Sequence, residues 1–201
     1  MISICMCQST CGVTNYQFQH RFWRSRRYEK YNYVYIAADI KREAAEKNKG
    51  FASLTFTYDL FHRIPLRDNS VDIIIYDPPF VTTGEGDERS EEYNIDTGLG
   101  VGFLERFHSR RVYEEFHRVL RESGILIVRG KDVNYPPVSN HHFLFLHDLL
   151  GKEKIKGLFE VLGLYIYRYY KANEPLIRRR LRRLVRPMYV HSYIVVLKAL
   201  K

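Results

Sequence analysis

A run of β-branched and aromatic residues that ends in Asp77-Pro78-Pro79-Phe80 is the stretch best suited to chemistry. Residues 73–76 read Ile-Ile-Ile-Tyr, which is typical of a buried strand. Neither proline can donate a main-chain hydrogen bond, and Pro79 forces Pro78 into an extended conformation, so the strand must stop there. We therefore expect Asp77 and Phe80 to be held rigidly at the carboxyl end of a strand. Open α/β sheets bind their ligands at that edge.

The residues around this stretch resemble the amino-methyltransferases, which are class I S-adenosylmethionine-dependent enzymes. Their fourth motif reads Asp/Asn/Ser-Pro-Pro-Tyr/Phe, and the lead-in of this chain, residues 64–72, is similar to theirs. A second match is the helix-to-strand joint at residues 113–126, and a third is the closing segment at residues 190–198. The resemblance implies methyl transfer from S-adenosylmethionine to an exocyclic amino group of a nucleic-acid base, with adenine N6 in DNA as the preferred target.

The same resemblance implies catalytic roles for Asp77, Pro78, Pro79 and Phe80. The carboxylate of Asp77 and the carbonyl of Pro78 would accept the two hydrogens of the amino group. Phe80 would stack on a base that has been flipped out of its helix. The other reading of Asp77, from the residues alone, is an acid that caps a turn.

Cofactor contacts are expected at the ends of the first three strands. An apolar run at 2–6 leads into small residues and then a helix-compatible segment, 13–27, so the main chain there can approach a ligand closely. The family has an acid and a glycine-rich loop at this point, whereas this chain has cysteines and one glycine. The carboxylate of Asp39 is suited either to accept hydrogen bonds from the two hydroxyl groups of a ribose or to cap the start of the next helix. The resemblance implies that Asp59 contacts the exocyclic amine of the adenine of the cofactor. The alternative is that Asp59 caps or stabilises a turn. The expected set is Cys5, Cys7, Ser9, Cys11, Gly12, Asp39, Ile40 and Asp59.

The charge of the chain favours a polyanionic partner. The formal net charge is +9 and the isoelectric point is near 9.4, and clustered basic residues bind phosphates by releasing counterions. We expect nucleic acid, with DNA favoured over RNA. The expected phosphate contacts lie in an Arg-rich insertion, 173–187, and are Arg178, Arg179, Arg180, Arg182, Arg183 and Arg186. The alternative for this insertion is a solvated amphipathic helix.

Three further expectations concern the surroundings of the site. The glycine-rich acidic segment 81–102 is predicted to be a flexible active-site loop, with a plain solvated loop as the alternative. The three cysteines lie close together near the start and have no fourth ligand at a zinc spacing, so neither a disulfide framework nor a metal is indicated. No apolar run approaches the roughly 20 residues that span a bilayer. We expect a cytoplasmic protein with no membrane contact, and a homodimer is a further expectation.

Alternating strand and helix patterns predict the fold. Strands are expected at 2–6, 33–38, 53–57, 73–76, 124–129, 164–170 and 190–197, with helices at 13–27, 41–47, 103–122, 143–162 and 173–187. The helix at 143–162 is expected to be interrupted or bent near 151–157. These elements make up a doubly wound, Rossmann-like α/β fold with a seven-stranded, mostly parallel sheet. The resemblance adds a final antiparallel strand. One domain, 1–201, accounts for the whole pattern. Two other functions stay open: methylation of RNA or a protein amide, and non-catalytic nucleic-acid binding with a degenerate cofactor loop.

Overall fold

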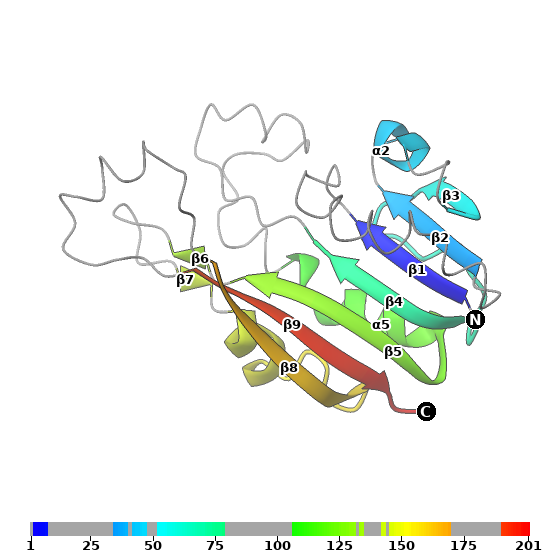
Figure 1. The fold of residues 1–201 in the computed structure, drawn as a ribbon. Coiled ribbons are helices and arrows are strands. Elements are labelled where there is room, and N and C mark those ends of the chain that lie inside the picture. The colour runs from blue at the N-terminus through cyan, green and yellow to red at the C-terminus, as the bar shows by residue number, and fades with distance from the viewer. Residues whose placement is uncertain are drawn as a thin grey trace, which may run out of the picture.

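The computed structural model describes residues 2–7, 34–39, 42–47, 52–78, 106–131, 133–134, 142–143, 145–169 and 190–201. Within these residues, seven strands form one mixed sheet (Figure 1). In spatial order they are β3 (Leu54–Thr57), β2 (Val34–Asp39), β1 (Ile2–Cys7), β4 (Val71–Asp77), β5 (Leu120–Lys131), β9 (Val190–Ala199) and β8 (Phe159–Tyr169). Strands β6 (Val133–Asn134) and β7 (His142–Phe143) form a separate pair. The described helices are α2 (Arg42–Lys47), α5 (Arg110–Val119) and the π-helix η2 (His147–Gly151).

Among the parallel strands, the order reverses direction between β1 and β4. Strand β1 pairs in parallel with β2 on one side and with β4 on the other. The sheet continues in parallel to β3 beyond β2, and to β5 beyond β4. Strand β9 lies between β5 and β8 and runs antiparallel to both. The carboxyl ends of β1 and β4 therefore meet at the topological switch point, where open α/β sheets bind ligands.

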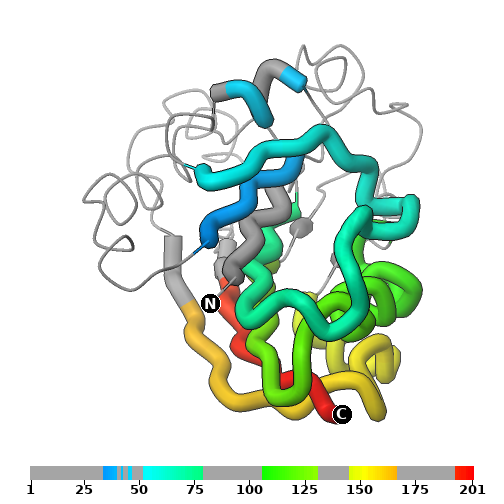
Figure 2. The backbone as a smooth tube through the Cα atoms, turned by 90° about the vertical axis from the view of Figure 1, so that its right-hand side faces the viewer, coloured from blue at the N-terminus to red at the C-terminus, as the bar shows by residue number. Residues whose placement is uncertain are grey.

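Helix α5 covers one face of the central strands. Its buried side chains stand at positions 112, 113, 116 and 119, a spacing that gathers them on one side of a helix. Tyr76 of β4 is fully buried, donates its hydroxyl hydrogen to the carbonyl oxygen of Phe107 (2.8 Å), and meets the Phe116 ring edge-on. Figure 2 shows α5 and the η2 region on the same side of the strands. Because side chains alternate along a strand, Asp77 projects from the opposite face to Tyr76.

Gly130, near the carboxyl end of β5, allows an aromatic ring to lie directly against the sheet. A Cβ atom at this position would stand 2.3 Å from the ring of Phe145. The Phe145 ring is fully buried, stacks on Tyr193 of β9 with 5.9 Å between centroids, and meets His108 edge-on. Close packing, rather than a turn, is what requires glycine here.

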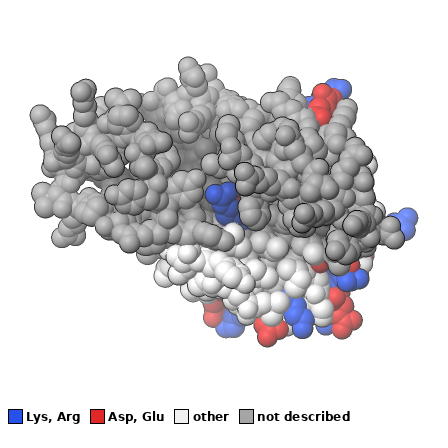
Figure 3. All heavy atoms as spheres, viewed as in Figure 1, with Lys and Arg blue, Asp and Glu red and all other residues white. Residues whose placement is uncertain are grey.

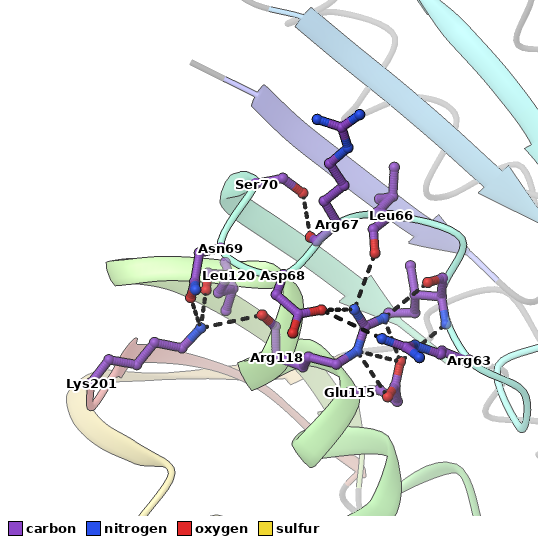
Figure 4. Close-up of polar contacts among 11 residues, drawn as sticks. Arg63, Leu66, Arg67, Asp68, Asn69, Ser70, Glu115, Arg118, Leu120 and Lys201 are labelled. Atoms are coloured by element: carbon purple, nitrogen blue, oxygen red, sulfur yellow. Dashed lines mark hydrogen bonds and ion pairs between the residues drawn. The ribbon is translucent and has the colours of Figure 1, made fainter.

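An ion-pair network fixes the loop that leads into β4 (Figure 4). Arg118 of α5 donates to the carbonyl oxygens of Ile64 (2.9 Å) and Leu66 (3.1 Å). The same guanidinium forms ion pairs with Asp68 and Glu115. Because only 18% of the Arg118 side chain is exposed, these contacts are screened by water less than surface pairs are. The resemblance noted at residues 64–72 and 113–126 therefore corresponds to one packed joint between loop and helix.

Strand β8 lies at the edge of the sheet and exposes large apolar side chains. Figure 3 shows a mostly uncharged surface over β8 and β9, with charged groups along its rim. The exposed large apolar residues on the described part of β8 are Val161, Leu162, Leu164, Tyr165 and Ile166. The register against β9 shifts between Val161 and Gly163, which marks a bulge in the edge strand.

Two helix predictions are wrong in part. The predicted helix at 103–122 ends at Val119, because Leu120 adopts an extended conformation and pairs with Val71 as the first residue of β5. The interruption predicted near 151–157 in the helix at 143–162 corresponds to turns at 152–158, but the helix does not resume after them, and β8 begins at Phe159 rather than at 164. Left-handed backbone at Glu153 (φ 53°) and Gly157 (φ 73°) stops a right-handed helix, and the free edge of β9 pairs with the apolar residues that follow.

Several predictions concern residues outside those described. They are the helices at 13–27 and 173–187 and the loop at 81–102, so their structures stay predictions. None of the described helices is long and apolar enough to cross a membrane.

Candidate active site

The carboxyl ends of four parallel strands bring several predicted site residues into one row. Asp77 is the last residue of β4 and stands in register with Cys7, the last residue of β1. Asp39 ends β2, on the other side of β1, and is in register with Thr57 of β3. Two carboxylates that lie far apart in sequence are thus placed on either side of the β1 end. Asp77 and Cys7 themselves flank the switch point.

Asp77 is a buried carboxylate with a cationic neighbour. Only 4% of the residue is exposed, and its Oδ2 lies 3.3 Å from Nη1 of Arg129 on the adjacent strand β5. Burial raises the pKa of Asp77 from an ordinary 3.8 to about 6, although the charge of Arg129 and its hydrogen bond lower it. Within the described residues, no hydrogen bond reaches the other oxygen, Oδ1. The carboxyl group is therefore poised to change its charge close to neutral pH, as groups at functional sites often are.

Pro78 follows Asp77 and is also buried. The strand ends at Asp77, as the sequence predicts from the two prolines. Pro79 and Phe80 lie outside the described residues, so the stacking role of Phe80 stays a prediction.

Asp39 provides the second buried carboxylate of the row, with 2% of the residue exposed. Its carbonyl oxygen accepts a hydrogen bond from the main-chain N–H of Tyr58 (2.9 Å), which holds the end of β2 against the segment that follows β3. A carboxylate in this position suits the hydroxyl groups of a ribose, because both oxygens accept hydrogen bonds. The cofactor role of Asp39 fits its place in the fold and stays a prediction.

Asp59 has a structural role in the turn after β3. Its Oδ1 accepts a hydrogen bond from the main-chain N–H of Phe61 (2.9 Å), and its Oδ2 lies 3.4 Å from Nε2 of His62. These contacts are those of an acid that stabilises its own turn. The side chain is 37% exposed, so the predicted contact with adenine stays open beside the turn role.

The other predicted site residues are only partly described. Cys5 and Cys7 lie on β1, where the structure describes the main chain alone. The remaining predicted cofactor residues, Ser9, Cys11, Gly12 and Ile40, lie outside the described residues. The same holds for the predicted phosphate-binding arginines of the 173–187 insertion. Among described residues, no group of three His, Cys, Asp or Glu side chains could hold a metal ion.

Arg129 is the site residue that the sequence alone did not single out. It follows the apolar residues 125–128 of β5, and the signal was a charged residue at the end of such a run. Its importance depends on register: Val128 pairs with Tyr76, so Arg129 comes next to Asp77. That register cannot be read from the local pattern.

A separate hollow of about 500 Å³ is lined by residues 63–68. These residues precede β4, so the hollow lies at the opposite end of the strand from Asp77. Its lining includes Ile64, Leu66 and Asp68, which Arg118 already holds. We assign this hollow to the packing of the loop rather than to the site.

Comparison with known proteins identifies the fold. No protein-family model matches the sequence, and no curated protein matches it. Among solved structures, a S-adenosylmethionine-dependent methyltransferase from Methanosarcina mazei matches at 12% identity and a TM-score of 0.50, over 98% of this chain and 92% of that one. A putative sarcosine dimethylglycine methyltransferase from Galdieria sulphuraria matches at 12% identity and a TM-score of 0.52, over 98% and 77% of the two chains. The [4+2]-cyclase SpnF matches at 14% identity and a TM-score of 0.56, over 98% and 74%.

The chain has a Rossmann-like methyltransferase fold. This confirms the predicted fold at that level. At such low identities the similarity shows the fold alone. A cyclase among the matches illustrates that one methyltransferase fold can carry different activities, so the function must be argued from the site.

Proposed function

We propose that the protein transfers a methyl group from S-adenosylmethionine to an exocyclic amino group of a nucleic-acid base, with adenine N6 in DNA as the preferred target. One observation carries the proposal. Asp77, a buried carboxylate whose pKa is raised to about 6, lies at the carboxyl end of β4, beside the switch point of a methyltransferase fold. A carboxylate there provides the hydrogen-bond acceptor that an amino group needs.

The chemistry of an aromatic amine explains why such an acceptor helps. The nitrogen lone pair is delocalised into the ring, so the amine is a poor nucleophile unless the site favours its pyramidal form. Asp77 Oδ1 and the Pro78 carbonyl would each accept one N–H, which orients the nitrogen and localises its lone pair. Correct orientation of two reactants removes much of the entropic barrier of an in-line displacement.

The bond changes balance without a metal or a redox partner. A bond forms between the amino nitrogen and the methyl carbon as the carbon–sulfur bond breaks, and its electron pair stays on sulfur. The nitrogen then loses one proton, which Asp77 accepts and passes to water. A carboxyl group whose pKa is about 6 is suited to this exchange near neutral pH.

The described residues fit the expected cofactor in part. S-adenosylmethionine supplies the electrophilic methyl group. Asp39 would hold the ribose hydroxyls at the end of β2, since its carboxylate is buried where the fold brings β2 beside β1. Cys5 or Cys7 of β1 stands where the resembled family has an acid, so cofactor binding has to be measured directly.

The decisive experiment compares two acid-to-amide variants of one strand. Asp77→Asn should abolish transfer of labelled methyl from S-adenosylmethionine to DNA while leaving the affinity for S-adenosylmethionine largely unchanged in calorimetry. Asp72→Asn is the matched control: Asp72 is also buried, forms an ion pair with Arg121 (2.6 Å), and lies at the opposite end of β4. This control should keep most of the transfer activity.

Offering three methyl acceptors in parallel distinguishes the proposed function from its alternatives. DNA, RNA and protein are each offered to the wild-type protein with labelled cofactor. Label in RNA or protein alone would reject DNA as the substrate. No binding of S-adenosylmethionine at millimolar concentration would reject methyl transfer and favour a non-catalytic nucleic-acid-binding protein. Normal turnover by Asp77→Asn would reject the role given to Asp77.

A further inference from the structure

The ion pair between Asp77 and Arg129 involves only one of the two oxygens of the carboxylate. Arg129 Nη1 lies 3.3 Å from Oδ2, and the two residues stand on adjacent parallel strands that hold them at a fixed separation. The Asp77 side chain is 6% exposed and that of Arg129 is 30% exposed. Oδ1 receives no hydrogen bond from the described part of the chain. One oxygen is therefore tethered, and the other remains available as an acceptor.

Arg129 also opposes the effect of burial on the charge of Asp77. Transfer of a carboxylate from water into a protein interior favours its neutral form, and a nearby cation restores the charged form. A neutral carboxyl group that carries its proton on Oδ1 would donate a hydrogen bond rather than accept one. Such a group would repel the N–H that the proposed reaction presents to it.

We propose that Arg129 is the positioning residue of this site: by holding Oδ2 of Asp77, it keeps the carboxylate charged and directs Oδ1 toward the amino group of the substrate. This inference rests on the proposed function and extends it to a residue on a different strand. Arg129 acts through Asp77 and has no direct part in the chemistry.

The neighbourhood of Asp77 contains few other groups that could take this role. Among described residues, Cys7 stands beside it in register on β1, and Asp39 ends the strand beyond β1. Tyr76 lies on the other face of β4, and burial raises the pKa of its hydroxyl, so that this group is neutral. The charge of Arg129 and its hydrogen bond are the influences that lower the pKa of Asp77.

Two substitutions of Arg129 separate charge from packing. Arg129→Gln removes the charge but keeps a side chain that can donate a hydrogen bond, and Arg129→Lys keeps the charge. The first readout is the titration of the Asp77 carboxyl carbon by NMR in the full-length protein, which needs no substrate. Arg129→Gln should move the titration upward by about one to three pH units, and Arg129→Lys should restore most of the difference.

The second readout is the pH profile of methyl transfer, with labelled S-adenosylmethionine and the acceptor that the wild-type protein methylates. Arg129→Gln should shift the acid limb upward by the same amount as the titration. Near pH 6.5 this means a loss of about threefold for a shift of one pH unit and of more than tenfold for a shift of two, with a smaller loss at pH 9. Arg121→Met, which breaks the ion pair with Asp72 at the far end of β4, should leave the acid limb in place.

Failure of this inference can be told from failure of the proposed function. An unchanged Asp77 titration in Arg129→Gln, or a loss of transfer that is equal at every pH, would overturn the role of Arg129. If the wild-type protein methylates none of the acceptors, the proposed function fails, and the NMR titration alone decides whether Arg129 keeps Asp77 charged. If Arg129→Gln does not fold, the same comparison is made between the wild type and Arg129→Lys, where an acid limb displaced by more than one pH unit would contradict the proposal.

Discussion

At the scale of single residues, Asp77 lies in a buried position that destabilises the charged form of its carboxyl group. Desolvation is the largest influence on its pKa, and a single hydrogen bond of 3.3 Å from Arg129 offsets it only in part. By contrast, Arg118 satisfies its partners with several shorter hydrogen bonds. A protein that needed Asp77 only to end a strand would gain stability from a neutral residue there. The retained carboxylate therefore favours a chemical role over a structural one.

The first prediction is that Asp77→Asn makes the protein more stable at neutral pH. A carboxyl group whose folded pKa is raised favours the folded state below its ordinary value, and this advantage is lost as the pH rises from 3.8 through about 6. That interval corresponds to about 3 kcal/mol, and we expect a net gain of about 1–2 kcal/mol at pH 7.5 because the ion pair between Asp77 and Arg129 is lost.

Thermal or urea unfolding at pH 4.5 and pH 7.5 checks this prediction. The stability difference between Asp77→Asn and the wild type should shrink at the lower pH, where Asp77 is protonated in the folded wild type. Asp72→Asn loses the ion pair with Arg121, so it should be no more stable than the wild type at either pH. An Asp77→Asn variant that is less stable than the wild type at pH 7.5 would contradict the account.

At the scale of elements, the site depends on how closely β5 packs against its surroundings. Arg129 can reach Asp77 only if the end of β5 keeps its register with β4. The next residue, Gly130, receives the ring of Phe145, which also contacts β9 through Tyr193. The position of Arg129 is thus coupled to the aromatic packing behind the sheet.

The second prediction is that Gly130→Ala destabilises the protein by about 1–3 kcal/mol, the usual cost of an overpacked core. A methyl group 2.3 Å from the Phe145 ring requires that the ring or the strand move. Gly163→Ala is the matched control in a strand, because its Cβ would meet the Tyr165 ring at an ordinary 3.5 Å and should cost less than about 1 kcal/mol. Chemical denaturation measures both, and equal costs would show that ring contact is not the cause.

The sequence predicted the elements well where local signals were strong. Strands β1, β2, β3 and β4 begin and end within two or three residues of the predicted bounds. The paired prolines located the end of β4 at Asp77, because a proline effect is local. The segment after η2 was misassigned, because pairing with β9 overrides its helical pattern. Arg129 was missed for a similar reason: its partner is 52 residues away, and only the register of the sheet brings the two together.

At the scale of the whole molecule, the excess of positive charge is the main argument for a nucleic-acid partner. The chain has 32 Lys and Arg residues against 23 Asp and Glu. Basic residues in the described parts are often paired, as with Arg110 and Glu114 or Arg42 and Glu46. The predicted DNA contacts, in the 173–187 insertion, lie outside the described residues. Homodimer formation and cytoplasmic location stay predictions as well.

The third prediction addresses this charge. Replacement of Arg179, Arg180, Arg182 and Arg183 by Ala should weaken binding to a DNA duplex and reduce the slope of log affinity against log salt by about two to four. A matched control removes four exposed basic residues elsewhere, namely Arg42, Arg67, Arg111 and Lys156. Titrations at several salt concentrations measure both slopes. Equal slopes for the two variants would assign the effect to net charge and not to the insertion.

The place of β9 in the sheet has a consequence for biosynthesis. Strand β8 is translated before β9, yet β9 is the strand that joins it to β5. While the polypeptide leaves the ribosome, β8 has no neighbour on the sheet, and the outer side of β5 is an open edge. Both keep exposed main-chain donors and acceptors until residues 190–199 have emerged, so a chaperone would be of most use before β9 pairs with them.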